Sequence, residues 1–208
     1  TPSDSFTMRI SDGTTSTTQT YTVNVAGAND APVISGTNNS NQLEQNFGSV
    51  SSGFNFSDVD APANYNNYVF EANQNAWKSG DKFAVDFNMG TDVAFALTGK
   101  PFYDTNTKVA YYEVSAGNFV PVAVVSGGVG DKITFSFYYG NQSVYNYTTQ
   151  QYETITFYAD SALKVNTIIK TLYFVAFSDD PTAQNGVPEN RSLTFRMTDG
   201  SNWSNTLT

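Results

Sequence analysis

The sequence contains neither cysteine nor histidine. Without cysteine there are no disulfides and no thiol nucleophiles, and without histidine there is no Ser-His-Asp triad. The two residue types that hold most zinc sites are also missing. Calcium needs only oxygen ligands, so these absences leave Ca²⁺ as the metal that the chain is equipped to bind.

Positive charge is scarce as well. The chain has 10 Lys and Arg residues against 19 Asp and Glu residues, which gives a formal net charge of −9. Phosphate binding needs clustered cations, so we expect no nucleic-acid partner. The acidic balance instead favours cations as ligands.

Long hydrophobic runs are absent too. No run approaches the roughly 18 apolar residues of a membrane-spanning helix, so we expect no direct membrane insertion. No signal peptide is visible and the chain begins within a strand-like pattern, which predicts a fragment of a larger secreted protein. Charged residues make up only 14% of the chain, and Thr, Ser, Asn, Gly and Tyr are abundant. This bias is typical of an extracellular, cell-surface β protein.

The two ends of the chain resemble each other. "SFTMRISDG" (5–13) and "SLTFRMTDG" (192–200) share Ser, Thr, Arg, Asp and Gly, and both alternate apolar and polar residues before an Asp-Gly turn. Such a match is the signature of a repeat array. We therefore predict a terminal β-hairpin over 1–28, either the tail of a preceding repeat or a strand supplied to the main sandwich, which covers 29–208.

Between these copies most of the sequence reads as short strands. In "DSALKVNTIIKTLYF" (160–174), by contrast, Val165, Ile168, Ile169 and Leu172 fall at helical spacing, with Asp160 or Ser161 as the N-cap. Many short strands and one short helix predict an all-β sandwich. The expected strands lie in 53–56, 68–72, 82–89, 92–98, 108–114, 118–125 and 131–140.

Three stretches carry a family resemblance. "TVNVAGANDAPV" (22–33) resembles the junction of cadherin-like repeats in giant bacterial surface adhesins of the RTX type, and "FSDVDAP" (56–62) resembles the Asp-x-Asp element after such a junction. Residues 162–200 resemble the closing third of one such repeat class. The resemblance implies an extracellular, calcium-binding β-sandwich of the cadherin/Ig-like type, with adjacent repeats of the same chain as neighbours.

The candidate calcium ligands are acidic residues and asparagine in these stretches. Asp58 and Asp60 share a face if their stretch is extended, and a cation between them would relieve their repulsion; the alternative is a solvated acidic loop. Asn29 and Asp30 match the end of the cadherin linker, but alanine stands at two earlier ligand positions, so one ion is expected there; the alternative is a plain turn before proline. The resemblance adds three further ligands, namely Asp179, Asp180 and Glu189. Asp12 and Asp199 precede glycine in hairpin turns, and we assign them a structural role.

The matching copies are separated by more chain than a simple extender repeat needs, which indicates a long insertion at about 88–158. Its second part, "FYYGNQSVYNYTTQQYETITFY" (137–158), is rich in tyrosine. Tyrosine combines a flat apolar face with a polar tip, which suits recognition of sugars or peptides. The alternative is that the tyrosines only cover a sheet. The candidate ligand-binding residues are Tyr138, Tyr139, Tyr145, Tyr147 and Tyr152.

Three functions fit these features. The first is a calcium-dependent adhesion module, important for biofilm-type attachment, that binds a peptide or glycan on a host or neighbouring cell. The second is a passive, calcium-rigidified extender that projects other binding domains. The third is a glycosidase-like enzyme, which needs paired carboxylates. The carboxylates of the middle region show no defensible pairing, so we expect no enzyme. These carboxylates are Asp86, Asp92, Asp104, Glu113 and Glu153.

Overall fold

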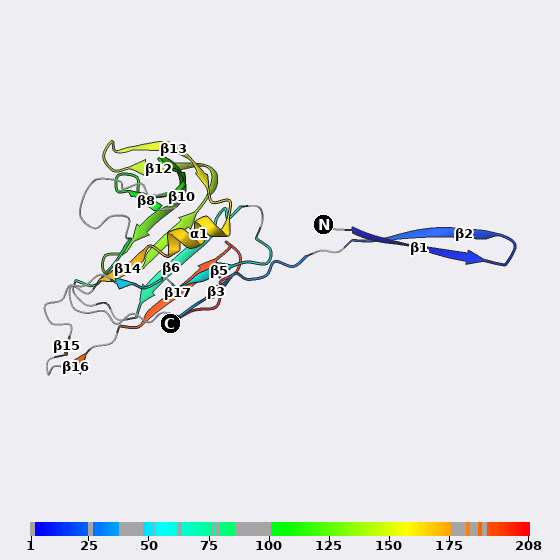
Figure 1. The fold of residues 1–208 in the computed structure, drawn as a ribbon, viewed down its shortest axis with the longest axis horizontal. Coiled ribbons are helices and arrows are strands. Elements are labelled where there is room, and N and C mark those ends of the chain that lie inside the picture. Colours follow the sequence, from blue (N-terminus) through cyan, green and yellow to red (C-terminus); the bar gives the residue numbers. More distant parts are fainter. Residues whose placement is uncertain are drawn as a thin grey trace. The chain divides into compact units, whose positions relative to one another are not determined.

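The computed structural model describes residues 3–24, 27–37, 48–51, 53–61, 64–75, 77, 80–85, 101–175, 182–183, 187–188 and 191–208. The chain separates into two compact units, Thr1–Asp30 and Ala31–Thr208. The described residues are mostly β, in several antiparallel sheets (Figure 1), which is consistent with an all-β sandwich. No helix among them is both long and apolar enough to cross a membrane.

The first unit is a hairpin of β1 (Ser3–Ser11) and β2 (Ser16–Asn24). Its register places Phe6 opposite Tyr21, and the two rings stack at 5.5 Å. Since directly paired residues share a face, one face of the hairpin collects the large apolar side chains and the other collects Ser, Thr, Asn and Arg. The exposed apolar residues are Phe6, Met8, Ile10, Tyr21 and Val23.

The second unit is built on a six-stranded antiparallel sheet with the strand order β17-β6-β11-β10-β9-β8. Strand β11 alternates cleanly: its residues Ile133, Phe135 and Phe137 are all buried, as the sequence pattern predicts. In the order of the sheet the strands are β17 (Leu193–Thr198), β6 (Val69–Gln74), β11 (Ile133–Phe137), β10 (Asn118–Gly127), β9 (Val109–Ser115) and β8 (Pro101–Asp104).

One face of this sheet carries the main core. Phe70 packs against Phe135 and Phe195, while Phe54 meets Phe195 edge to face at 4.7 Å. The opposing layer contains a three-stranded sheet, β4-β14-β7, a pair, β3-β5, and the helix α1 (Ala162–Ile169), all contributing to the same core. These strands are β4 (Gly48–Ser49), β14 (Leu172–Val175), β7 (Lys82–Val85), β3 (Val33–Ser35) and β5 (Asn55–Ser57), and a separate pair is formed by β15 (Thr182–Ala183) and β16 (Val187–Pro188).

The helix confirms the sequence prediction. Ser161 is its N-cap, and its side chain accepts from the Lys164 N–H. Val165 and Ile168 are fully buried, whereas the amide of Asn166 accepts from the N–H of Phe56 at 2.7 Å and donates to its carbonyl at 3.1 Å. These two bonds tie α1 to β5, so the helix also fixes the strand that leads into Asp58.

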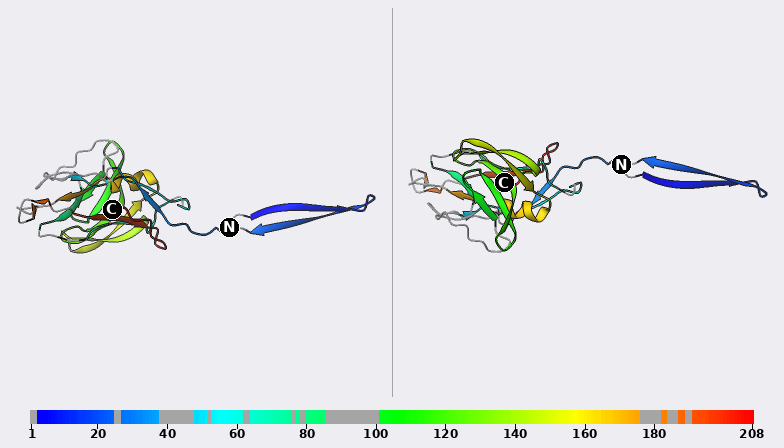
Figure 2. Two further views of the ribbon diagram at one scale, coloured as in Figure 1. Left: turned by 90° about the horizontal axis from the view of Figure 1, so that it is seen from below. Right: turned by 90° about the horizontal axis from the view of Figure 1, so that it is seen from above.

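The opposite face of the six-stranded sheet is covered by a second hairpin, β12 (Tyr139–Asn146) and β13 (Gln151–Tyr158). Val144 and Phe157 of this hairpin form a small separate core with Val109 of β9. Figure 2 shows the hairpin as an outer layer of the unit. The sequence analysis predicted no strand beyond residue 140 in this part of the insertion, whereas residues 139–158 form a regular hairpin. The polar residues Asn141, Ser143, Thr154 and Thr156 share its solvent face with tyrosines.

The two similar sequence stretches end in turns that can be compared directly. Oδ1 of Asp12 accepts from the N–H groups of Thr14 and Thr15 at 2.9 and 2.7 Å, and Oδ1 of Asp199 accepts from those of Ser201 and Asn202 at 2.6 and 2.7 Å. The glycine after each Asp has a positive φ, +92° and +94°. The two sequence copies therefore form the same turn.

Candidate functional site

The tyrosines of the insertion gather on the β12–β13 hairpin. Its register sets Tyr145 opposite Tyr152 and Tyr139 opposite Tyr158, so each pair shares a face. Between the two pairs the Thr156 hydroxyl donates to Oδ1 of Asn141 at 2.6 Å. The hairpin therefore presents two aromatic rungs separated by hydroxyl and amide groups.

Three of these rings form a cluster at the turn end of the hairpin. Tyr145 meets Tyr147 at 5.1 Å and Tyr152 at 5.2 Å, both edge to face. Each such contact is worth about 0.5–1.5 kcal/mol, so the rings hold one another in place. Tyr147 is nevertheless 60% exposed and Tyr152 is 72% exposed. The cluster thus offers rigid aromatic surface to solvent.

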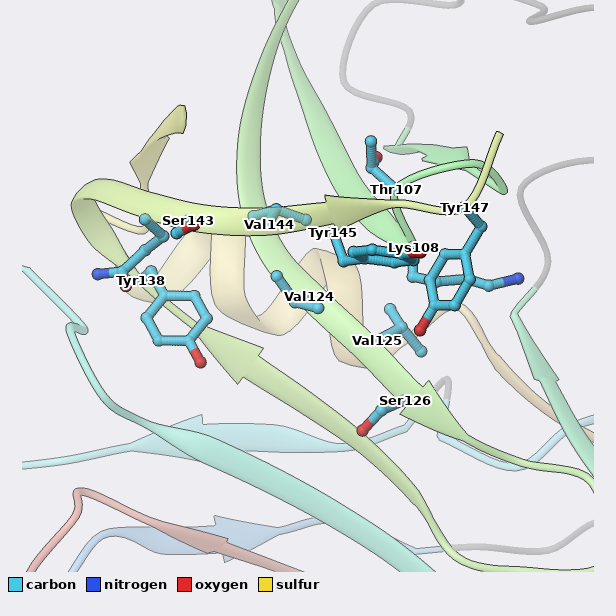
Figure 3. Close-up of a pocket in the computed structure, with 11 residues that line it drawn as sticks. Thr107, Lys108, Val124, Val125, Ser126, Tyr138, Ser143, Val144, Tyr145 and Tyr147 are labelled. Carbon is cyan, nitrogen blue, oxygen red and sulfur yellow. The ribbon is translucent and has the colours of Figure 1, made fainter. Parts of the chain in front are cut away.

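A pocket of about 220 Å³ lies beside this cluster. Figure 3 shows strand β12 passing over it, Val124, Val125 and Ser126 of β10 beneath, Tyr138 at one end, and Lys108 with Tyr147 at the other. The volume suits one sugar ring or one amino-acid side chain rather than a whole drug-sized ligand. The lining residues are Thr107, Lys108, Val124, Val125, Ser126, Tyr138, Gln142, Ser143, Val144, Tyr145 and Tyr147.

The β8–β9 turn anchors the hairpin at the pocket. The backbone N–H of Tyr147 donates to the carbonyl of Asn106 at 2.8 Å, and the Thr148 hydroxyl donates to Oδ1 of the same residue at 2.8 Å. Asp104 stabilises the turn itself, because its carboxylate accepts from the Asn106 N–H at 2.9 Å and from the Thr107 hydroxyl at 2.6 Å. The backbone at Tyr147 and the neighbouring Thr148 is therefore tied to Asn106.

Lys108 ends this turn in a conformation that lysine rarely adopts. Its φ is +60°, in the left-handed region that favours glycine and asparagine, at a cost of the order of 1 kcal/mol. Its Nζ lies 5.6 Å from the centre of the Tyr147 ring, a cation–π contact. Among the lining residues that the structure describes, Lys108 is the one charged group, and no described carboxylate forms an ion pair with it.

Two phenols, on β8 and β9, stay protonated at physiological pH. Burial raises the pKa of Tyr103 to about 12, with Asp104 and Tyr147 adding to the shift. Burial, followed by the charge of Asp104, also raises the pKa of Tyr111.

The structure thus brings together four of the five tyrosines predicted as ligand-binding residues. Tyr138, Tyr145 and Tyr147 line the pocket and Tyr152 packs on Tyr145, whereas Tyr139 pairs with Tyr158 at the far end of the hairpin. Sequence reasoning missed Lys108, Ser126 and Thr107. The one local signal was the turn sequence Asp-Thr-Asn-Thr-Lys (104–108), which puts a bulky residue where glycine is expected.

Asp58 and Asp60 do not lie on an extended stretch. Strand β5 ends at Ser57, and Asp58 begins a turn in which its Oδ1 accepts from the Asp60 N–H at 2.9 Å. The expected shared face of two strand residues therefore does not apply. Oδ2 of Asp58 accepts from the Tyr68 hydroxyl at 2.7 Å, so the carboxylate is held in one orientation.

The other predicted calcium ligands form no defined site among the described residues. Asn29 and Asp30 are exposed in a segment without regular secondary structure, while Asp179, Asp180 and Glu189 lie outside the described residues. Within the described ranges no three Asp or Glu side chains converge as a ready metal-binding group. Asp58 and Asp60 can supply two of the six to eight oxygens that calcium takes.

The carboxylates considered for catalysis are engaged separately. Asp104 stabilises the β8–β9 turn, Glu153 accepts from the Asn146 amide at 2.7 Å, and Glu113 is buried with one oxygen accepting from the Gly117 N–H at 2.8 Å. Asp86 and Asp92 lie outside the described residues.

Comparison with known proteins adds no assignment: no protein-family model matches the chain, and neither the curated proteins nor the solved structures contain a significant match.

Proposed function

We propose that the unit Ala31–Thr208 is a ligand-binding module of an extracellular bacterial adhesin that recognises a peptide or glycan on another cell. The observation that carries this proposal is the pocket beside the Tyr145, Tyr147 and Tyr152 cluster. Exposed aromatic rings held rigid by one another bind with little loss of side-chain entropy. Aromatic rings that only covered a sheet would have no need of a pocket beside them.

The chemistry around the pocket supports recognition rather than catalysis. Apolar ring faces lie next to Ser126, Ser143 and Gln142, which donate and accept hydrogen bonds. Such a mixture suits ligands that are themselves amphipathic, such as sugar rings or peptide side chains.

Calcium is the second part of the proposal. Asp58 and Asp60 would supply two of the oxygens that hold an ion, and backbone carbonyls or water would supply others. The bound ion would neutralise the carboxylates of an acidic chain and stiffen the turn after β5.

Arrays of glycans and of short peptides, probed with the purified protein in calcium and in EDTA, test the function. We expect specific hits that Tyr147→Ala weakens, because this ring lines the pocket and is largely exposed. Tyr158→Ala is the matched control, an exposed tyrosine of the same hairpin outside the pocket lining. An absence of hits on both arrays would contradict the proposal.

A passive extender is the second candidate, favoured by the matching turns at Asp12 and Asp199. A chain that forms the same turn after two similar strand sequences has the organisation expected of a repeat array. An extender would give no array hits, yet would still respond to calcium in its thermal stability.

A further inference from the structure

Strand β12 has one free edge, and the free edge borders the pocket. At one end the N–H of Tyr139 donates to Oδ1 of Asn66 at 3.1 Å, and just past the other end the N–H of Tyr147 donates to the carbonyl of Asn106 at 2.8 Å. Both bonds leave the side of the strand that faces away from β13. Backbone groups of alternate residues point the same way, so those of Asn141, Ser143 and Tyr145 also point outward.

These three residues lie between the two anchors, and their outward N–H and C=O groups have no partner in the described structure. The backbone groups of the intervening residues, Gln142, Val144 and Asn146, point to β13 instead. Strand β12 is paired with β13 over its whole length without a bulge. The open stretch from Asn141 to Tyr145 is about 14 Å long at 3.4 Å per residue. It therefore has room for an added strand of about five residues.

The edge lacks the usual protection against pairing with another chain. Proteins block exposed edges with lysine, proline, bulges or a covering segment. Strand β12, "YGNQSVYN", contains no charged residue and no proline. The free groups also follow the pocket, since four consecutive residues of β12, from Gln142 to Tyr145, line it.

The pocket beside β12 carries a positive charge at one end. Lys108 and Tyr147 stand where β12 ends, and Tyr138 stands near its beginning (Figure 3). Lys108 contacts an aromatic ring rather than a carboxylate, in a chain with a net charge of −9. A ligand carboxylate would supply the anion that the described residues do not.

We propose that an extended peptide adds to the free edge of β12 and places a carboxylate at Lys108. Backbone hydrogen bonds to Asn141, Ser143 and Tyr145 hold the peptide, and one of its side chains enters the pocket. A peptide parallel to β12 brings its C-terminal carboxylate to Lys108, whereas an antiparallel one brings an acidic side chain near its N-terminus. The inference rests on the proposed ligand-binding function and names its ligand class.

The test uses arrays of short random peptides in three forms: with a free C-terminus, with an amidated C-terminus, and amidated with an N-terminal Asp. A glycan array is probed in parallel. We expect binding to peptides that carry a carboxylate at one end, at least tenfold stronger than to the amidated peptide without Asp. Preference for the free C-terminus indicates parallel pairing, and preference for the N-terminal Asp indicates antiparallel pairing.

Two variants separate the contribution of the β12 backbone to binding from that of the Lys108 charge. Ser143→Pro removes an outward N–H and blocks the edge while leaving the bonds to β13, so we expect at least tenfold weaker binding, with Ser143→Ala as the matched control. Lys108→Met should abolish the preference for the carboxylate. If Ser143→Pro does not fold, N-methylation of alternate backbone nitrogens of a bound peptide tests the same bonds on the unaltered protein. We expect methylation at the bonded positions to weaken binding at least tenfold.

The outcomes are distinguishable. Glycan hits without peptide hits overturn the peptide inference and leave the ligand-binding function standing, whereas no hits on any array overturn both. Equal binding by the Ser143→Pro and Ser143→Ala variants, or insensitivity to N-methylation, overturns pairing at the edge. A carboxylate preference that persists in Lys108→Met overturns the role of Lys108.

Discussion

The hydroxyl of Tyr68 donates a 2.7 Å hydrogen bond to Oδ2 of Asp58, while Oδ1 of the same carboxylate accepts from the Asp60 N–H. Burial and the bond to Asp58 raise the pKa of Tyr68, so the phenol remains a donor under all physiological conditions. Asp58 is therefore oriented by the protein itself, with lone pairs left over for a cation.

Removing calcium should destabilise the protein through this carboxylate. A site at tenfold excess of free ion over its Kd adds about 1.4 kcal/mol, which corresponds to a Tm higher by about 3–5 °C in calcium than in EDTA. Differential scanning calorimetry measures the difference. Asp58→Asn should reduce it, whereas Asp131→Asn, an exposed carboxylate in another turn, should not. An identical Tm in calcium and EDTA for the unaltered protein would refute the calcium proposal.

Alkaline pH should destabilise the fold through its buried phenols. The pKa of Tyr103 is raised from 10.0 to about 12, so its contribution is complete below pH 10 and is lost as pH rises toward 12. The full shift corresponds to roughly 2.7 kcal/mol, which partial exposure reduces to about 1–2 kcal/mol. Denaturant unfolding across this pH range should show the loss. Tyr103→Phe should diminish it, and Tyr152→Phe should leave it unchanged.

Acid should destabilise the Ala31–Thr208 unit through Glu71. Burial raises the pKa of this carboxyl, but hydrogen bonds from Lys132 at 2.6 Å and from Arg196 at 2.9 Å outweigh burial and lower it below 4.5. Its contribution is therefore present above pH 4.5 and is lost as pH falls through the lowered pKa. Glu71→Gln should cost about 2 kcal/mol at neutral pH, since both partners are partly exposed. Urea unfolding measures this cost. Asp160→Asn removes a more exposed carboxylate, paired with Lys164, and should cost below about 0.5 kcal/mol; equal costs for the two variants would contradict the expectation.

The two Asp-Gly turns should differ in consequence although they match in geometry. Asp199→Ala removes the acceptor that folds residues 201–207 back onto β17, where Leu207 pairs with Phe195. We expect a loss of about 1–2 kcal/mol from the Ala31–Thr208 unit. Asp12→Ala breaks the same turn in the other unit and should leave the unfolding of Ala31–Thr208 unchanged. Thermal unfolding followed by the near-ultraviolet signal of Trp77 and Trp203 reports on that unit alone, because both tryptophans belong to it.

Local patterns carried the fold prediction further than the site prediction. The Ser161 cap, the alternation of β11 and the Asp-Gly turns follow from neighbouring residues, and the structure confirms them. The six-stranded order does not follow, because β17 pairs with β6 across more than a hundred residues. The hairpin β12–β13 was not predicted because tyrosines stand only at the two ends of its solvent face, with polar pairs between them, so no apolar period-2 pattern results.

The candidate site could be predicted only where its residues are neighbours in the sequence. The tyrosines are adjacent in sequence, so their clustering was visible from composition. Lys108 approaches Tyr147 only because β9 and β12 are brought together by the small core around Val109 and Val144. The turn at Asp58 depends likewise on Tyr68, ten residues away, and no local rule places that hydroxyl.

The β1–β2 hairpin has its own consequence for the isolated chain. A two-stranded ribbon is only marginally stable in water, and this one leaves Met8 49% exposed where its counterpart in the second copy, Phe195, is fully buried. At high concentration two hairpins can bury their apolar faces against each other. An apparent molecular mass from light scattering that rises with concentration, and returns to the monomer value when Ile10 is replaced by threonine, would reveal such self-association.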